Sequence, residues 1–516
     1  MCDKVTHMEL LNSVASESEN VVVEENSVNE ASAFIDDIVS ISCESESGSD
    51  SESESDSESK NDFCDNLLEE DLDEITIMIN EYIDDYLKTE VLKMSHPDFH
   101  KHMIEDITHI LFQSFQDAQV LQDSDYDSLL LLVDHHCEDW FYSGKDLNYP
   151  ARTIAHYNAN AHVHEYGLAE DYTQKYLTDK LSLLRELNDA SPKQRTPEWY
   201  QGRYNMMTAS NIWQAFNSQA QINRLIYEKC KPLDFGYTEN KWVNTENSLH
   251  WGVKYEPLTV LVYEHLMGAK VEEFGCIQHP KYPFIGASPD GIITNRESPL
   301  YGRMLEIKNI YNREMDGIPS EAYWVQTQIQ METCDLDVCD FVETRFEEYD
   351  DVATFYQDND SKIRGIILHF APKDGASNVP LYKYMPLNIS VDGSGSGTVI
   401  DGSGTAIDEW VCQTINDVSE THVLFKTIYW YLADIKMSIV KRNTAWFKAA
   451  LPIIQQTWNT ILEERVSGYE HRAAKKRSGS STNNILVLNS DNGSDSQLIT
   501  NMPIMKSGGI CLIKIE

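Results

Sequence analysis

Two short segments near the middle of the chain carry the residue types of a metal-dependent phosphodiesterase. Asp290 lies between a proline and a glycine, and Glu306 and Lys308 follow two residues apart on the next apolar segment. Mg²⁺ prefers oxygen ligands and commonly takes only one or two carboxylates from a protein. On a strand, residues two apart point to the same face. The pattern therefore predicts that Glu306 binds the metal while Lys308 orients or deprotonates the attacking water.

The neighbours of Asp290 predict how its carboxylate is aimed. Proline and glycine on either side favour a sharp bend, which would point Asp290 at the same site. Two alternatives remain open for these segments alone. Asp-Gly between apolar runs is also a hairpin signal, and Glu-x-Lys also occurs by chance on exposed strands.

Further short motifs flank this pair in a fixed order. They are RTPEWYQGR at 195–203, TAS at 208–210, HWGVKYEP at 250–257 and YWVQTQIQM at 323–331. With the two central segments, this set resembles the YqaJ-type viral recombinase family of large DNA viruses and phages, which includes phage lambda exonuclease and belongs to the PD-(D/E)xK nuclease superfamily. The resemblance runs from about Arg195 to Glu343, under a third of the chain.

The resemblance implies a metal site and a catalytic lysine. It implies one or two Mg²⁺ or Mn²⁺ ions, whose ligands would be Asp290, Glu306, Glu256 and the backbone carbonyl of Ile307. Lys308 matches the catalytic lysine of the family. A structural alternative stays open for Glu256, since an acid in the first turns of a helix also complements the helix dipole.

The resemblance also implies contacts with the phosphates of a DNA end. The matching side chains are Arg203, Ser210, Ser288, Gln326 and Gln328. The arginine fork suits a phosphate, and Ser210 precedes a helical pattern, so it could cap a helix whose N-terminus favours an anion. A surface ion pair for Arg203, capping alone for Ser210 and a polar helix or strand face for the glutamines remain alternatives. Gln330 extends the polar series, and the sequence leaves open which glutamine reaches the site.

The net charge of −43 over 516 residues is concentrated at the N-terminus. Residues 1–90 hold 27 acidic residues and 3 lysines, and 44–59 are Ser, Glu or Asp except for one glycine. Such a segment buries too little apolar surface to offset its chain entropy, which predicts disorder. The other 426 residues carry about −19, so a DNA-binding groove would be a local basic patch.

Composition and periodicity divide the chain into four predicted parts. These are a disordered acidic tail at 1–75, a mainly helical accessory region at 76–190, the nuclease domain at 191–470, and a basic cluster with a flexible tail at 471–516. Strand-like segments at 284–287, 304–307, 338–346 and 365–370 lie between helical patterns. Apolar stripes in 408–465 predict C-terminal helices. The fold class expected is α/β: a restriction-endonuclease-like PD-(D/E)xK core whose mixed central sheet is flanked by helices.

These observations predict a Mg²⁺-dependent deoxyribonuclease, a 5′–3′ exonuclease resecting duplex ends for viral recombination, repair or replication; the polarity comes from the resemblance alone. The alternatives are a structure-specific endonuclease on the same scaffold and a non-catalytic DNA-binding scaffold. Expected partners are double-stranded DNA ends and a single-strand annealing protein, with homo-oligomerisation open. Ten scattered cysteines without C-x-x-C pairs, and residues 1–20 without an apolar signal core, predict an intracellular protein in the host cytoplasm or a viral replication site. No apolar run reaches the ~20 residues of a membrane span.

Overall fold

The computed structural model describes residues 69–142, 170–233, 245, 247–358, 362–373, 379–389 and 406–474. Most of the acidic tail, the Gly/Ser-rich stretch at 393–404 and the chain beyond 474 lie outside the described residues. Contacts divide the chain into two compact units, Met1–Met78 with Phe112–Leu129, and Ile79–Leu111 with Leu130–Glu516. The boundaries of these two units differ from those of the four predicted parts, which stay predictions.

The described chain begins with helices, as the apolar periodicity before residue 190 predicts. Ile75, Ile79 and Ile83 recur every fourth residue on one helix face and are fully buried. The first of these helices already begins at Glu69, inside the segment predicted as tail. The elements are α2 (Glu69–Thr89), η2 (Val91–Ser95), α3 (Phe99–Asp117), η3 (Asp123–Asp125), α4 (Tyr126–Tyr142) and α6 (Glu170–Ala190).

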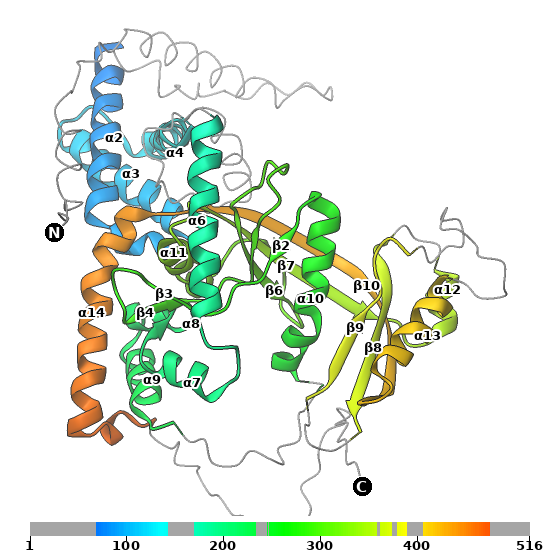
Figure 1. Cartoon of the computed structure of the whole chain (residues 1–516). Coiled ribbons are helices and arrows are strands. Elements are labelled where there is room, and N and C mark those ends of the chain that lie inside the picture. The colour runs from blue at the N-terminus through cyan, green and yellow to red at the C-terminus, as the bar shows by residue number, and fades with distance from the viewer. Residues whose placement is uncertain are drawn as a thin grey trace, which may run out of the picture. The chain divides into compact units, whose positions relative to one another are not determined.

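Two sheets form the centre of the larger unit (Figure 1). The small sheet has the order β1 (Met207–Thr208), β4 (Ile285–Ala287), β3 (Ile277–Gln278). The large sheet has the order β2 (Val271–Glu272), β5 (Gly291–Ile293), β6 (Met304–Asn309), β7 (Val338–Glu348), β10 (His422–Lys441), β8 (Arg364–Pro372), β9 (Leu381–Tyr384). The β6–β7 pair is parallel and the other pairs of the large sheet are antiparallel, so the sheet is mixed. The predicted α/β class with a mixed sheet is confirmed.

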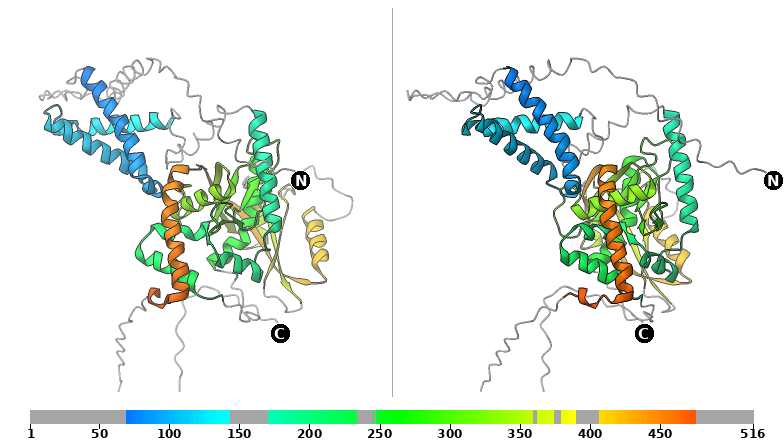
Figure 2. Two further views of the ribbon diagram at one scale, coloured as in Figure 1. Left: turned by 60° about the vertical axis from the view of Figure 1, so that its left-hand side comes forward. Right: turned by 90° about the vertical axis from the view of Figure 1, so that its left-hand side faces the viewer.

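Helices flank these sheets. They are α7 (Pro197–Tyr204), α8 (Ala209–Ile212), η5 (Trp213–Phe216), α9 (Gln219–Cys230), α10 (Ser248–Met267), α11 (Glu321–Cys334), α12 (Val352–Gln357), α13 (Ala406–Val418), α14 (Thr444–Ser467) and η6 (Glu470–Arg472). Asn247 caps the start of α10 by accepting from the backbone N–H of His250 at 2.7 Å. Gly268 ends α10 with φ 60°, a left-handed conformation that glycine adopts at little cost. Helix α14 packs beside α9 (Figure 2).

The large sheet has different neighbours on its two faces, and this positions the site. On one face, Leu305 and Ile307 of β6 pack with Val342 of β7 and Tyr263 of α10 in a buried apolar cluster. Burying each such side chain contributes roughly 1.5–3 kcal/mol. Glu306 lies between them in sequence and therefore points to the opposite face, towards α11. Strand alternation thus separates the apolar anchor of β6 from its polar side chains.

The structure corrects the prediction of helices throughout 408–465. Residues 422–441 form the 20-residue strand β10, whose first half pairs with β8 and whose second half pairs with β7. Both edges of β10 are occupied over Trp430 and Tyr431, which appear in both registers. Pairing with β8 along its first half and with β7 along its second outweighs the helix-like spacing that the apolar residues also permit. No helix among the described segments combines the length and the apolar character needed to cross a membrane.

Candidate active site

The Asp290 carboxylate is positioned by the passage of the chain from the small sheet into the large one. Strand β4 ends at Ala287 and β5 begins at Gly291, in the other sheet. The β5–β6 pair is antiparallel with Gly291 opposite Leu305, which places Asp290 across from Glu306. Asp290 Oδ2 accepts a hydrogen bond from the Ile307 backbone N–H at 2.7 Å. The Asp290-Gly291 step therefore leads into strand β5 and does not form a hairpin turn, so the hairpin alternative does not apply.

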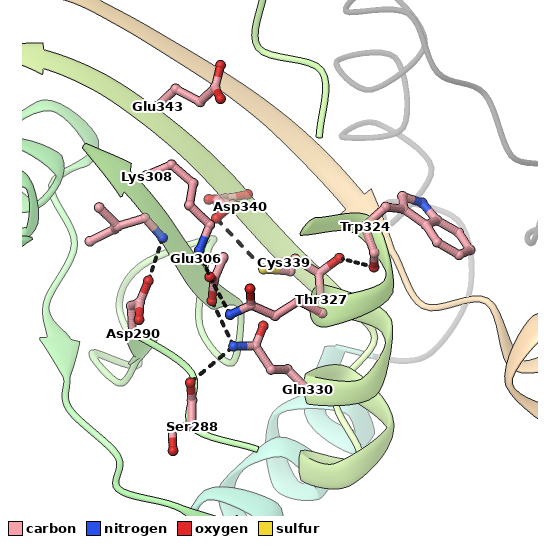
Figure 3. Close-up of polar contacts among 12 residues, drawn as sticks. Ser288, Asp290, Glu306, Lys308, Trp324, Thr327, Gln330, Cys339, Asp340 and Glu343 are labelled. Carbon is pink, nitrogen blue, oxygen red and sulfur yellow. Dashed lines mark hydrogen bonds and ion pairs between the residues drawn. The ribbon is translucent and has the colours of Figure 1, made fainter. Parts of the chain in front are cut away.

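Glu306 is held by three donors although it is fully buried (Figure 3). Its Oε1 pairs with Lys308 Nζ and accepts from Gln326 Nε2 at 2.6 Å. Its Oε2 accepts from Gln330 Nε2 at 2.7 Å, and this amide also donates to the Ser288 carbonyl at 3.1 Å. A buried carboxylate is tolerated only when it is paired and hydrogen-bonded. The lysine and two glutamines fulfil that requirement and fix the Glu306 side chain.

Lys308 turns inward as the strand geometry predicts. Besides its ion pair with Glu306, its Nζ lies 4.7 Å from the centre of the Tyr323 ring, a cation–π contact. Burial acts to lower the pKa of Lys308, but the charges of Glu306 and Asp290 outweigh it, so that the pKa is raised. The ammonium form is therefore favoured.

The three acids of the expected metal site repel one another. Burial and then the charge of Glu306 raise the pKa of Asp290 well above its usual range, with a further contribution from Glu256. The Glu256 side chain reaches solvent, yet the protein packed around it and then the charge of Glu306 raise the pKa of that carboxyl too. Within the described part of the chain, no three His, Cys, Asp or Glu side chains group closely enough to hold a metal ion. Glu256 is therefore within electrostatic reach of the pair without completing a three-ligand cluster.

The oxygen atoms available as metal ligands at this site nevertheless fit a hard divalent cation. Asp290, just before β5, and Glu306, on the adjacent strand β6, offer carboxylate oxygens, and Mg²⁺ commonly takes one or two carboxylates and keeps several waters. The Ser288 hydroxyl and Gln330 Oε1 are buried polar atoms with no hydrogen-bond partner among the described residues. Soft or nitrogen-rich donors are not part of this group, so an oxygen-preferring ion suits it better than zinc.

Arg203 and Ser210 lie together through a residue that the predictions did not include. Thr208 Oγ1 accepts from Arg203 Nη2 at 3.4 Å and lies 3.3 Å from the Ser210 hydroxyl. The Arg203 guanidinium also lies over the Trp199 ring, 4.7 Å from its centre. Thr208, and not Ser210, is the N-cap of α8, and its backbone N–H donates to Asn211 Oδ1 at 2.9 Å. The capping role expected of Ser210 is corrected, because the Thr208-to-Asn211 spacing makes a reciprocal cap.

The three glutamines of α11 separate onto two sides. Gln326 and Gln330 are four residues apart on a helix, and both reach Glu306. Gln328 instead donates to the Lys441 carbonyl at 2.9 Å and accepts from the Asn443 N–H at 2.6 Å. The structure thus does not bring Gln328 to the site. Tyr323, the first residue of the same motif, contacts the Lys308 ammonium with its ring, a role that the sequence analysis did not predict.

Comparison with known proteins confirms the family resemblance for this region. Residues 198–337 match the model of the YqaJ-like viral recombinase domain. An uncharacterised protein of Acanthamoeba polyphaga mimivirus is 27% identical over 337 residues, which cover 58% of this chain and 58% of that protein. The chain therefore matches only a little over half the length of this curated relative.

Two solved structures were also found as neighbours. An alkaline exonuclease from Laribacter hongkongensis is 18% identical with a TM-score of 0.27, covering 54% of this chain and 95% of that one. A phage-related exonuclease from Haemophilus somnus is 13% identical with a TM-score of 0.27, covering 50% and 96%. TM-scores this low do not establish a shared fold, so the fold is defined by the strand order given above.

Proposed function

We propose that this protein is a divalent-metal-dependent deoxyribonuclease, an exonuclease that degrades duplex DNA from its ends in the 5′–3′ direction during viral recombination, repair or replication. One observation carries the proposal: Asp290, directly before β5, lies across from Glu306 of the adjacent strand β6, with the Lys308 ammonium held against Glu306. The match of residues 198–337 to the YqaJ-like viral recombinase domain supports it.

Asp290 and Glu306 would hold one or two Mg²⁺ or Mn²⁺ ions, with Glu256 nearby and the Ile307 carbonyl as the further ligand that the family resemblance implies. When bound, such an ion polarises the phosphodiester and lowers the pKa of water. The chain supplies the rigidity. Gln326 and Gln330 hold both oxygens of Glu306, and the Ile307 amide holds Asp290, so the carboxylates need little reorganisation before reaction.

Lys308 would act on the attacking water. Its ammonium is fixed between Glu306 and the Tyr323 ring, so its direction is set before substrate binds. A cation at this position offsets negative charge that develops on the phosphate and orients the water that attacks phosphorus. Because Lys308 is held in the ammonium form, the proton of that water would be transferred to solvent.

The DNA end would be held by the group around Thr208. Arg203 offers a planar fork of donors, and the Ser210 hydroxyl is the second donor beside the same threonine. Ser288 has a free buried hydroxyl next to the Asp290 segment and would add a third phosphate contact. Such contacts fix register on the DNA without reading base sequence.

The proposal is tested by cleavage of linear duplexes with 5′-phosphate or 5′-hydroxyl ends, with Mg²⁺ and with chelator. Asp290→Asn and Lys308→Ala are each expected to abolish cleavage while leaving DNA binding largely intact. Lys270→Ala is the control, because the Lys270 side chain is 73% exposed and its ammonium pairs with Glu264, outside the hydrogen-bond network of Asp290 and Glu306. Full activity of either site variant would refute the assignment. Equal cleavage of covalently closed duplex would instead establish the endonuclease alternative.

A further inference from the structure

Four aromatic contacts form a continuous column from the core of the large sheet to the protein surface. Trp430 of β10 meets Phe346 of β7 edge to face at 5.4 Å between ring centres. Phe346 stacks on Tyr255 of α10 at 5.0 Å, and Tyr255 contacts Trp251 at 4.4 Å. Trp251 meets Tyr311 at 5.1 Å. The inner three rings are buried, whereas the last ring, Tyr311, is 53% exposed.

The ring beneath Tyr311 is held firmly. The Lys254 ammonium lies 4.6 Å from the centre of the Trp251 ring and pairs with Glu348 at 2.6 Å. The Tyr255 hydroxyl donates to the same Glu348 oxygen at 2.9 Å. The Lys254–Glu348 ion pair, whose lysine is buried, and the contact with the core ring of Tyr255 thus fix the position of Trp251. Tyr311 consequently rests on a rigid support and keeps part of its own ring open to solvent.

The exposed end of this column lies beside the proposed active site. Tyr311 follows Lys308 by three residues, a reach of roughly 10 Å along an extended chain. Trp251 precedes Glu256 by five residues of α10, a rise of about 7.5 Å. The Ile310 N–H donates to the Thr344 carbonyl at 2.8 Å, so the β6 backbone is still tied to β7 just before Tyr311. These short separations keep the Tyr311 ring close to the Lys308 and Glu256 end of the proposed active site.

A half-exposed ring on a rigid aromatic support next to a phosphodiester site is suited to a flat, apolar ligand. Nucleobases stack on such rings irrespective of their identity. An exonuclease must hold the strand that it cuts without reading its sequence. We propose that Tyr311, backed by Trp251, is a stacking platform for an unpaired nucleobase one or two nucleotides from the scissile phosphate. This inference rests on the proposed nuclease function.

The test is binding of a single-stranded oligonucleotide with 2-aminopurine near its 5′-phosphate, measured by fluorescence with the full chain in the absence of metal. Stacking should quench the fluorophore in the wild-type protein. Tyr311→Ala should abolish that quenching and weaken binding roughly fivefold or more. Tyr311→Trp should keep both the quenching and the wild-type affinity. Tyr356→Ala is the matched control, because Tyr356 is 47% exposed and lies on α12.

An oligonucleotide lacking the base at the probed position separates stacking from structural damage. Wild type and Tyr311→Ala should bind this abasic strand equally, because the platform then has nothing to hold. Equal quenching in wild type and Tyr311→Ala, or an affinity loss that persists on the abasic strand, would overturn the inference. If the wild-type protein shows Tyr311-dependent quenching but cleaves no DNA, only the nuclease proposal is overturned. If it cleaves normally but shows no such quenching, only the stacking platform is overturned.

Discussion

Replacing Gln330 with methionine tests the hydrogen bonds that hold the Glu306 carboxylate. Gln330 is fully buried, and its amide donates to Glu306 Oε2 at 2.7 Å and to the Ser288 carbonyl at 3.1 Å. Methionine has nearly the same shape but donates no hydrogen bond. The substitution therefore leaves a buried carboxylate oxygen and a backbone carbonyl without this donor, and creates little empty volume.

The expected cost follows from the two lost bonds and one gain. A hydrogen bond to a charged group contributes about 1.5–3 kcal/mol and a neutral one about 1 kcal/mol. Gln330 Oε1 has no partner among the described residues, so its removal returns about 1 kcal/mol of desolvation cost. The free energy of unfolding should fall by about 2 kcal/mol. Cleavage should fall as well, because Glu306 is then held by Gln326 and Lys308 alone.

Urea unfolding and a nuclease assay on folded protein measure the two effects separately. Gln328→Met is the matched control from the same helix, since it also loses two bonds, to Lys441 and Asn443. The control should lose stability but keep its rate of cleavage per folded molecule. A loss below about 0.5 kcal/mol for Gln330→Met, or a larger cleavage defect in Gln328→Met, would refute this account of the site.

Three further predictions concern other parts of the fold. Lys254→Met should lower stability by about 1.5–3 kcal/mol, because Glu348 loses its hydrogen bond with a buried cation and keeps the more exposed Lys426 ammonium at 3.3 Å. Adding Glu348→Leu should recover most of this loss, as chemical denaturation would measure. Burial, and then nearby cationic groups, lower the pKa of His369 to about 4 from 6.5. Between pH 6.5 and 4, the His369 imidazole is protonated in the unfolded chain but not in the folded protein. About 3 kcal/mol of stability should therefore be lost as the pH falls through this range. His369→Phe should flatten this part of the stability–pH curve. Gly291→Ala should cost about 1–3 kcal/mol, because a Cβ there would lie 2.2 Å from Val271 Cγ1; thermal melts should show partial rescue by Val271→Ala.

The sequence by itself determined the parts of this protein that depend on local spacing. Period two on β6 puts Glu306 and Lys308 on one face, and the structure pairs them. The proline and glycine around Asp290 mark a break between strands, which the structure places between β4 and β5. Family order of the short motifs predicted the domain that residues 198–337 match. Each of these depends on residues that are near neighbours in the chain.

Tertiary structure decided the features whose partners are distant in sequence. The apolar residues of 422–441 fit a helical or a strand period, and only the edges of β7 and β8 made this segment β10. The glutamines would share a face on a strand, but on α11 only Gln326 and Gln330 do so, and Gln328 binds the chain before α14. The edge-to-face contact of Tyr311 with Trp251 joins segments about sixty residues apart. A sequence states which side chains are available, but long-range pairing fixes which of them meet, because that energy exists only once the distant partners are packed.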